Sequence, residues 1–292
     1  MQATLIQRKV RELGAVARYG VMTRAQIQDV AEVRNDRQVR ADLMELVGDG
    51  LLARASMEVV HPRAGRPAPV YFPTSRGVEI AAEAFDEPRF LATSTQRPNM
   101  AHLFHFTQVT DVRILLDRAI AGQSLVSLGG SLAEWDLANT HEKDARDPHK
   151  KYRLYTLLTE KPRLVCAPDA AFLLVVQEYR KVYYVEIDRG SSGIRQIAAS
   201  KTPGYAELAR RQWHQRHFET NVDTFSVLHV CPSASRRDLL RNEIKSKDGA
   251  GLHRFVSWID CEPARLLHDP IFWTCNETEP QPLVKQAVGA TS

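Results

Sequence analysis

The fold of this chain is decided by residues 168–205, which read PDAAFLLVVQEYRKVYYVEIDRGSSGIRQIAASKTPGY. Two apolar runs of strand length, separated by a polar turn, predict a pair of antiparallel strands. Asp169 opens the first strand, and Glu186 and Asp188 close the second, so hairpin pairing brings Asp169 level with Glu186. Because side chains alternate along a strand, Glu186 and Asp188 are expected to project from the same face. The sequence therefore predicts three carboxylates at one end of a sheet.

A helix is predicted to follow this strand pair and to carry Lys201. The positions Ile194, Ala198, Lys201 and Tyr205 are spaced by four, three and four residues, which places the lysine on the helix face that turns towards the sheet. A lysine on a buried face needs a partner, and the carboxylates are the expected one. Oxygen ligands beside a lysine are the groups that a magnesium-dependent phosphodiesterase uses. Pro203 is expected to kink or interrupt the helix.

The N-terminal part of the chain shows the pattern of three helices followed by a hairpin. Apolar spacing predicts helices in residues 4–17, 24–31 and 37–47, and two short apolar runs predict strands in residues 51–54 and 69–73. This order is typical of a winged helix, a variant of the helix-turn-helix motif that places its third helix in the major groove.

Polar side chains of this N-terminal part are candidate DNA contacts, because they are able to donate to phosphates and base edges. The loop of the hairpin is the wing of such a domain. From the helices and the wing we select Arg24, Asn35, Arg37, Gln38, Arg40, Arg63 and Arg66. Acidic neighbours on the third helix weaken the electrostatic case. The alternatives are an ordinary solvated helix face and a winged helix that contacts only proteins.

Length and composition fit a soluble protein of two domains. The 292 residues are 43% hydrophobic and 25% charged, and the net charge of +4 is compatible with a nucleic-acid partner. We find no signal-peptide pattern and no apolar run long enough to span a bilayer, so a cytoplasmic protein without membrane association is expected. The cysteines lack zinc-finger spacing, and Cys166 and Cys231 are expected to be buried free thiols.

The expected fold class is α/β (α+β), with a winged helix-turn-helix domain in residues 1–88 and a polar linker in residues 89–99. A mixed sheet flanked by helices is expected in residues 100–276, because strands and amphipathic helices alternate there. The last residues, 277–292, are polar and contain proline, and we expect them to be a disordered tail.

Several stretches resemble the replication-relaxation family of plasmid and integrative-element proteins. They are PDAAF at 168–172, YYVEIDRG at 183–190, GRPAPVYFPTSRG at 65–77 and HFTQVTDVR at 105–113. The resemblance covers residues 5–215. It implies an N-terminal DNA-binding domain and a C-terminal domain similar to the PD-(D/E)xK nuclease fold, in a protein concerned with replication, relaxation or transfer of mobile DNA.

Carried onto this chain, the nuclease pattern assigns Asp169 and Glu186 as ligands of Mg²⁺ or Mn²⁺. The shared strand face adds Asp188 as a third candidate ligand, and Lys201 is the remaining candidate catalytic residue. The sequence departs from the pattern at Asp188, which occupies the usual position of the lysine. In one interpretation Lys201 is that lysine, relocated to the helix. In the other the site is a relic, and Asp188 forms a structural salt bridge with Arg189 or Lys201.

The resulting hypothesis is a DNA-binding accessory or regulatory protein of a mobile element. Its expected partners are double-stranded DNA, a second copy in a homodimer and other replication or transfer proteins. The first alternative is a magnesium-dependent endonuclease or nickase that uses the four site residues. The second is a protein-interaction module without DNA binding.

Overall fold

The computed structural model describes residues 6–57, 67–138 and 146–284. Its contacts divide the chain into two compact units, one formed by residues 1–114 and 135–146 and the other by residues 115–134 and 147–292. Each unit contains both helices and strands. The mixed α/β class expected from the sequence is therefore confirmed.

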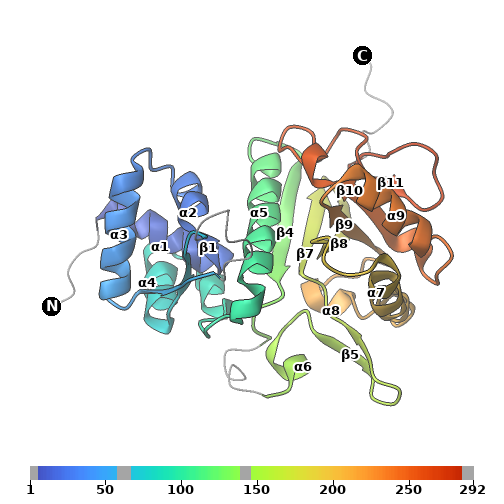
Figure 1. The fold of residues 1–292 in the computed structure, drawn as a ribbon, viewed down its shortest axis with the longest axis horizontal. Coiled ribbons are helices and arrows are strands. Elements are labelled where there is room, and N and C mark those ends of the chain that lie inside the picture. Colours follow the sequence, from blue (N-terminus) through green and yellow to red (C-terminus); the bar gives the residue numbers. More distant parts are fainter. Residues whose placement is uncertain (1–5, 58–66, 139–145, 285–292) are drawn as a thin grey trace. The chain divides into compact units, whose positions relative to one another are not determined.

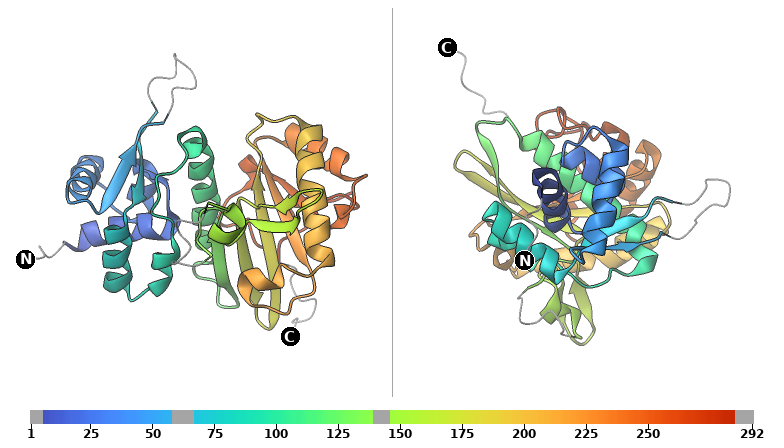
Figure 2. Two further views of the ribbon diagram at one scale, coloured as in Figure 1. Left: turned by 90° about the horizontal axis from the view of Figure 1, so that it is seen from below. Right: turned by 90° about the vertical axis from the view of Figure 1, so that its left-hand side faces the viewer.

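The N-terminal unit begins with three helices and a small sheet (Figure 1). Its elements are, in chain order, α1 (Gln7–Tyr19), β1 (Met22–Thr23), α2 (Arg24–Val30), α3 (Asp36–Gly48), β2 (Leu52–Ala55), β3 (Val70–Pro73) and α4 (Ser75–Phe85). The strands pair antiparallel in the order β1-β3-β2, and Figure 2 shows β2 and β3 side by side. Three helices followed by a hairpin are the order that the sequence predicted.

Local signals in the sequence set the starts of these helices. The Thr23 hydroxyl accepts from the Gln26 backbone N–H while the Gln26 side chain accepts from the Thr23 N–H, which forms a complete capping box at α2. Asn35 caps α3 and Thr74 caps α4 in the same way, by accepting a backbone N–H. Each cap satisfies a donor that the first helical turn leaves without a partner.

The core of the N-terminal unit is formed by the apolar stripes of its helices. Leu13 and Val16 of α1 meet Val39, Leu43 and Leu46 of α3, all at most 1% exposed. This is the stripe that helical periodicity predicted for α3, and it leaves the opposite face of that helix in solvent.

Residues 89–99, which were expected to be a linker, lie within the N-terminal unit. Residues 89–92 belong to η2 (Pro88–Ala92), and residues 93–99 connect it to η3 (Met100–His102) and α5 (Leu103–Ile120). Phe90 is buried in the core and its ring packs edge-on against Phe85. An aromatic side chain anchors this polar stretch, because burial removes its large apolar surface from water.

The C-terminal unit is built on a six-stranded mixed sheet with the order β11-β10-β9-β8-β7-β4. The strands are β4 (Val126–Ala133), β7 (Ala170–Val176), β8 (Tyr179–Ile187), β9 (Phe225–Cys231), β10 (His253–Ser257) and β11 (Trp273–Thr274). β4, β7 and β8 are antiparallel neighbours, β8, β9 and β10 are parallel, and β11 returns antiparallel. The expected mixed sheet is present.

Helices and a second hairpin complete this unit. They are α6 (Pro148–Lys151), β5 (Thr156–Thr159), β6 (Leu164–Cys166), α7 (Ile194–Arg210), α8 (Gln215–Phe218), α9 (Ala234–Ile244), η5 (Ala250–Leu252) and η6 (Trp258–Asp260). α7 buries Tyr205 and Leu208 against Tyr184 of β8 and Phe225 of β9. This packing fixes the face of α7 that also carries Lys201.

α7 is continuous through Pro203, so the interruption that was one of the two expected outcomes does not occur. The proline removes one backbone hydrogen bond, and the Thr202 hydroxyl donates to the Ala198 carbonyl at 2.8 Å beside it. Ala198 before the proline and Tyr205 after it are both buried, so packing holds the two halves of the helix on the sheet. Gly204 permits this approach, because a β-carbon there would lie 2.5 Å from a carbonyl oxygen of β6.

The expected disordered tail is ordered over its first part. The Gln281 backbone exchanges two hydrogen bonds with Phe272, and Leu283 is 6% exposed. The Tyr183 hydroxyl donates to the Leu283 carbonyl at 3.1 Å, which ties the segment to β8. Apolar residues late in a polar segment decide this outcome, and residues 285–292 lie outside the described part of the chain.

The expectation for the cysteines is confirmed. Cys166 and Cys231 are buried free thiols. In the described ranges, every helix is too short or too polar to cross a lipid bilayer.

Candidate functional site

The strand pair β7–β8 brings Asp169 and Glu186 together, as the sequence predicted. Ala170 pairs with Val185, so Asp169 lies opposite Glu186 at the end of the hairpin. The Asp169 backbone N–H donates to the Val185 carbonyl at 3.1 Å, and its carboxylate accepts the Ile187 N–H at 2.7 Å. Both carboxylates are buried, at 9% and 6% exposure. Hydrogen bonds between the strands therefore set their separation.

Lys201 reaches this pair from α7. Its ammonium lies 2.7 Å from Oε2 of Glu186 and donates to the Ala167 carbonyl at 3.1 Å. The Tyr205 hydroxyl donates to the other oxygen of Glu186 at 2.5 Å. Tyr205 follows Lys201 by one helical turn, so the same face of α7 supplies both donors. Both oxygens of Glu186 are thus occupied by side chains of the protein.

The environment shifts the pKa values of both members of this ion pair. Burial raises the pKa of Glu186 to about 7, because Lys201 offsets only part of the desolvation and Asp169 adds negative charge nearby. Burial lowers the pKa of Lys201, but the carboxylates of Glu186 and Asp169 raise it by more, so the net shift is upward. Lys201 therefore carries its positive charge at neutral pH.

Asp188 is held by a partner that the sequence did not indicate. Its two oxygens accept from Nε and Nη2 of Arg236 on α9 at 2.6 and 3.0 Å, and one of them also accepts the Gly190 backbone N–H at 2.9 Å. Asp188 lies beyond Ile187, the last residue of β8, so strand alternation no longer fixes its direction. Lys201 directs its donors to Glu186 and Ala167 instead.

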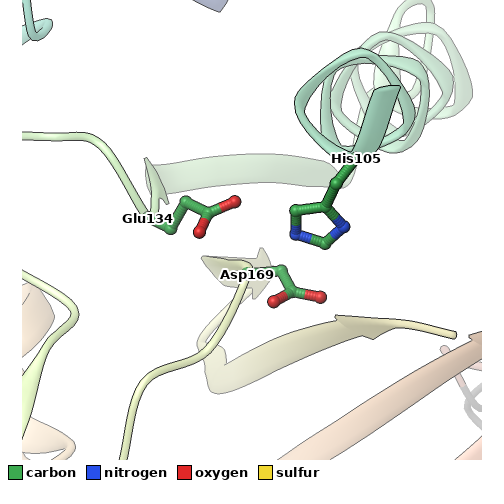
Figure 3. Close-up of side chains that lie close together, drawn as sticks. All are labelled: His105, Glu134 and Asp169. Carbon is green, nitrogen blue, oxygen red and sulfur yellow. The ribbon is translucent and has the colours of Figure 1, made fainter. Parts of the chain in front are cut away.

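Glu134 is a carboxylate at this end of the sheet that sequence reasoning did not select. It directly follows β4, and its backbone N–H donates to the Asp169 carbonyl at 2.9 Å. Figure 3 shows the two side chains at neighbouring strand ends, and carboxylate oxygens of Glu134 and Asp169 lie within 4.8 Å of each other. His105, also labelled there, belongs to α5 in the N-terminal unit. The sequence signal that could have identified Glu134 is the one used for Asp169 and Glu186, an acidic residue beside one end of a strand.

The candidate DNA contacts in the N-terminal unit fall into two groups. Arg24 lies 3.0 Å from Asp36, Asn35 caps α3, and the Gln38 side chain donates to Asp42 at 3.1 Å. These three side chains already stabilise the unit itself. Arg63 and Arg66 of the wing lie outside the described residues.

Arg37 and Arg40 form the second group, on the exposed face of α3. Across the described ranges, neither guanidinium has an ion-pair partner. They stand out from the acidic neighbours on the same helix, each of which is neutralised by a basic residue: Asp36 by Arg24, Asp42 by Arg8 and Glu45 by Lys9. α3 therefore presents two uncompensated positive charges to solvent.

Comparison with known proteins gives a single finding. The sequence model of the replication-relaxation family matches residues 13–223, which run from the middle of α1 to beyond α8 and include all of the Asp169, Glu186 and Lys201 cluster. Arg236, the partner of Asp188, lies outside the matched range. No match was found among curated proteins or among solved structures. The match extends over more than half of the chain, and the protein therefore belongs to the replication-relaxation family.

Proposed function

We propose that this protein is a DNA-binding accessory or regulatory protein of a mobile element, in which the N-terminal unit is a winged helix that reads double-stranded DNA. Membership of the replication-relaxation family suggests a role in replication or relaxation of plasmid or mobile-element DNA. The C-terminal unit acts as a scaffold or as a second DNA contact.

The arrangement of the N-terminal unit supports this proposal. α2 and α3 are joined by a short turn, and a hairpin of β2 and β3 follows, which is the order of a winged helix-turn-helix domain. In such domains the second helix of the motif enters the major groove. In this chain that helix is α3.

The observation that carries the proposal is the pair Arg37 and Arg40 on α3. Both are exposed near the N-terminal end of this helix, while the acidic residues of the same helix are neutralised within the protein. An arginine without an internal partner is available for phosphates or for the O6 and N7 atoms of guanine.

A mobility-shift titration with DNA of the element tests this function. The double variant Arg37→Gln/Arg40→Gln is expected to bind more weakly and with a shallower dependence on salt, because it lacks two positive charges whose binding to phosphates releases counterions. Arg89→Gln, which removes an exposed arginine outside α3, is the matched control. Equal binding by wild type and the α3 variant at low salt would sink the proposal.

The C-terminal unit has a connectivity that supports the PD-(D/E)xK-like interpretation. β4, β7 and β8 form an antiparallel meander, α7 crosses over, and β9 then pairs parallel with β8. We favour the scaffold interpretation of this unit because Arg236 and the Gly190 N–H occupy the oxygens of Asp188. An ion-paired Asp188 fits poorly as a metal ligand.

A metal-dependent endonuclease or nickase is the second candidate, and the cluster of Asp169, Glu186 and Lys201 favours it. Asp169 and Glu186 carry the oxygen atoms that Mg²⁺ or Mn²⁺ prefers and would hold the ion, which at Glu186 would have to displace Lys201 or Tyr205. A bound ion of this kind supplies Lewis-acid chemistry to a phosphodiester. Lys201 would place a positive charge beside the phosphate, as it now does beside Glu186.

Cleavage of supercoiled plasmid in the presence of Mg²⁺ or Mn²⁺ tests this candidate. A nuclease at this site requires that wild type nicks the plasmid and that Asp169→Asn and Glu186→Gln abolish nicking. Arg195→Gln, an exposed position on α7, controls for the handling of variants. No cleavage by wild type, or equal cleavage by the site variants, removes the enzyme from consideration.

A homodimer completes the proposal, because helix-turn-helix proteins commonly pair on sites with two-fold symmetry. Sedimentation of the protein alone and on DNA measures this state. A single copy per DNA site at all protein concentrations would contradict it. Binding of other replication or transfer proteins is tested by adding them to the same experiment.

A further inference from the structure

A pocket of about 530 Å³ lies in the C-terminal unit, at the turn between α7 and α8. Its lining includes Arg180 at the start of β8, Arg211 and Trp213 from the turn, and Arg216 from α8. Arg180 and Glu186 are six positions apart on β8, so the pocket lies roughly 20 Å along the strand from the carboxylate cluster. The pocket is therefore separate from the candidate metal site.

The charge of this pocket is positive. Three arginines line it, against the single carboxylate of Glu219. Arg211 lies 2.6 Å from Glu207, whereas Arg180 and Arg216 are exposed and have no ion-pair partner within the described part of the chain. Two guanidinium groups are thus available to an anion from solvent.

Trp213 fixes the position of two of these arginines. The guanidinium carbon of Arg211 lies 4.8 Å from the centre of the indole ring and that of Arg216 lies 4.4 Å from it. Cation–π attraction orders both side chains, and it does so for Arg216 without bringing a carboxylate to the guanidinium. A preorganised arginine loses less conformational freedom when it binds a ligand.

The turn itself is anchored by two buried histidines. Nε2 of His214 lies 2.7 Å from the Val222 carbonyl, and the ring of His217 lies 2.5 Å from the Tyr184 hydroxyl. Burial lowers the pKa of His217 to about 4, so this ring is neutral at neutral pH. In the basic stretch after α7, the two histidines are therefore buried and hold the turn, whereas Arg211 and Arg216 are exposed.

The backbone of the turn also adopts a conformation that most residues avoid. Gln212 and Glu219, which both line the pocket, have φ values of +53° and +50°. This backbone conformation is strained for a residue with a side chain and persists only where the surrounding contacts impose it. The histidine anchors, His214 directly before α8 and His217 within it, supply those contacts.

We propose that this pocket binds a phosphate group of the DNA backbone and gives the C-terminal unit its own DNA contact. Guanidinium groups bind phosphate oxygens through paired hydrogen bonds, and the neutral lining residues Thr220 and Asn221 add polar groups of the kind found at phosphate and sugar contacts. The contact is independent of base sequence. It rests on the proposed function, because it assumes that the protein meets DNA.

Fluorescence anisotropy of a labelled duplex of arbitrary sequence, titrated with the full-length protein over a range of salt concentrations, tests this inference. The double variant Arg180→Gln/Arg216→Gln is expected to reduce the slope of log affinity against log salt by about 2, close to one for each arginine that no longer neutralises a phosphate. Arg195→Gln removes one exposed arginine of the same unit and is expected to keep the wild-type slope. Both altered arginines are exposed, and an unchanged circular dichroism spectrum of the variant is the check that the fold is kept.

Comparing the pocket variant with the α3 variant separates this inference from the proposed function. A slope for Arg180→Gln/Arg216→Gln equal to that of Arg195→Gln overturns the phosphate pocket, whatever the α3 variants do. A reduced slope in this variant, together with unchanged binding by Arg37→Gln/Arg40→Gln, supports the pocket and overturns the winged-helix proposal. The preference for element DNA over arbitrary DNA is expected to stay at its wild-type value in the pocket variant.

Discussion

Replacing Glu12 with glutamine is expected to remove a pH-dependent loss of stability from the N-terminal unit. Glu12 lies on α1 with no exposed surface, and neither carboxylate oxygen has a hydrogen-bond partner in the described ranges. Burial raises the pKa of Glu12 from 4.5 to about 8, and the Asp42 carboxylate adds to this shift while nearby basic residues reduce it. The folded protein therefore keeps Glu12 protonated at neutral pH.

The sign and the size of the effect follow from proton linkage. The unfolded chain releases the Glu12 proton near pH 4.5 and the folded chain near pH 8, so stability is lost as pH rises through this window. At about 1.4 kcal/mol per pKa unit, the loss reaches up to about 5 kcal/mol at pH 8 and about 3 kcal/mol at pH 7. Glutamine does not ionise, so the variant avoids this loss.

Hydrogen exchange of the α1 backbone amides, corrected for intrinsic rates, measures the opening free energy of this helix. The difference between Glu12→Gln and wild type is expected to grow in favour of the variant from pH 4.5 to pH 8. Glu83→Gln, which removes an exposed carboxylate from α4, is the matched control. A difference that does not change with pH would refute the reasoning.

Three changes in the C-terminal unit have defined outcomes. Gly204→Ala is expected to lower the free energy of unfolding by about 1–3 kcal/mol, because the added methyl group would lie 2.5 Å from a backbone carbonyl oxygen. An unchanged denaturation curve would contradict this. Asp188→Asn is expected to cost about 2 kcal/mol of stability by weakening the two hydrogen bonds from Arg236, and a neutral result in urea unfolding would show that the pair is not structural. Tyr205→Phe is expected to raise the pKa of Glu186 above about 7, since the Tyr205 hydroxyl stabilises the ionised carboxylate. A fall in the pKa of Glu186, measured by carbon-13 NMR titration, would exclude this role of the hydroxyl.

Local pattern was sufficient to place the centre of the candidate site. Apolar runs of strand length predicted the β7–β8 pair, and the pairing brings Asp169 opposite Glu186. Helical spacing placed Lys201 and Tyr205 on the face of α7 that meets Glu186. Periodicity determines which side of an element is buried, and for neighbouring elements that also determines which side chains meet.

The caps and stripes of the N-terminal unit were equally local. Thr23 and Asn35 start α2 and α3 by accepting backbone N–H groups within the same turn. The apolar stripe of α3 fixed which of its polar residues face solvent, and Arg37 and Arg40 are among them. The sequence could not show that Arg24 pairs with Asp36, because that depends on how α2 packs beside α3.

Only the tertiary structure decided which charged side chains from distant segments lie close together. Asp188 meets Arg236 from α9, and Glu134 meets Asp169 because β4 pairs with β7. Pro203 stays within a continuous helix because packing on the sheet outweighs the missing hydrogen bond. Spacing along the chain carries no information about contacts of this kind. They depend on the order of strands in the sheet and on the helix that covers each end of it.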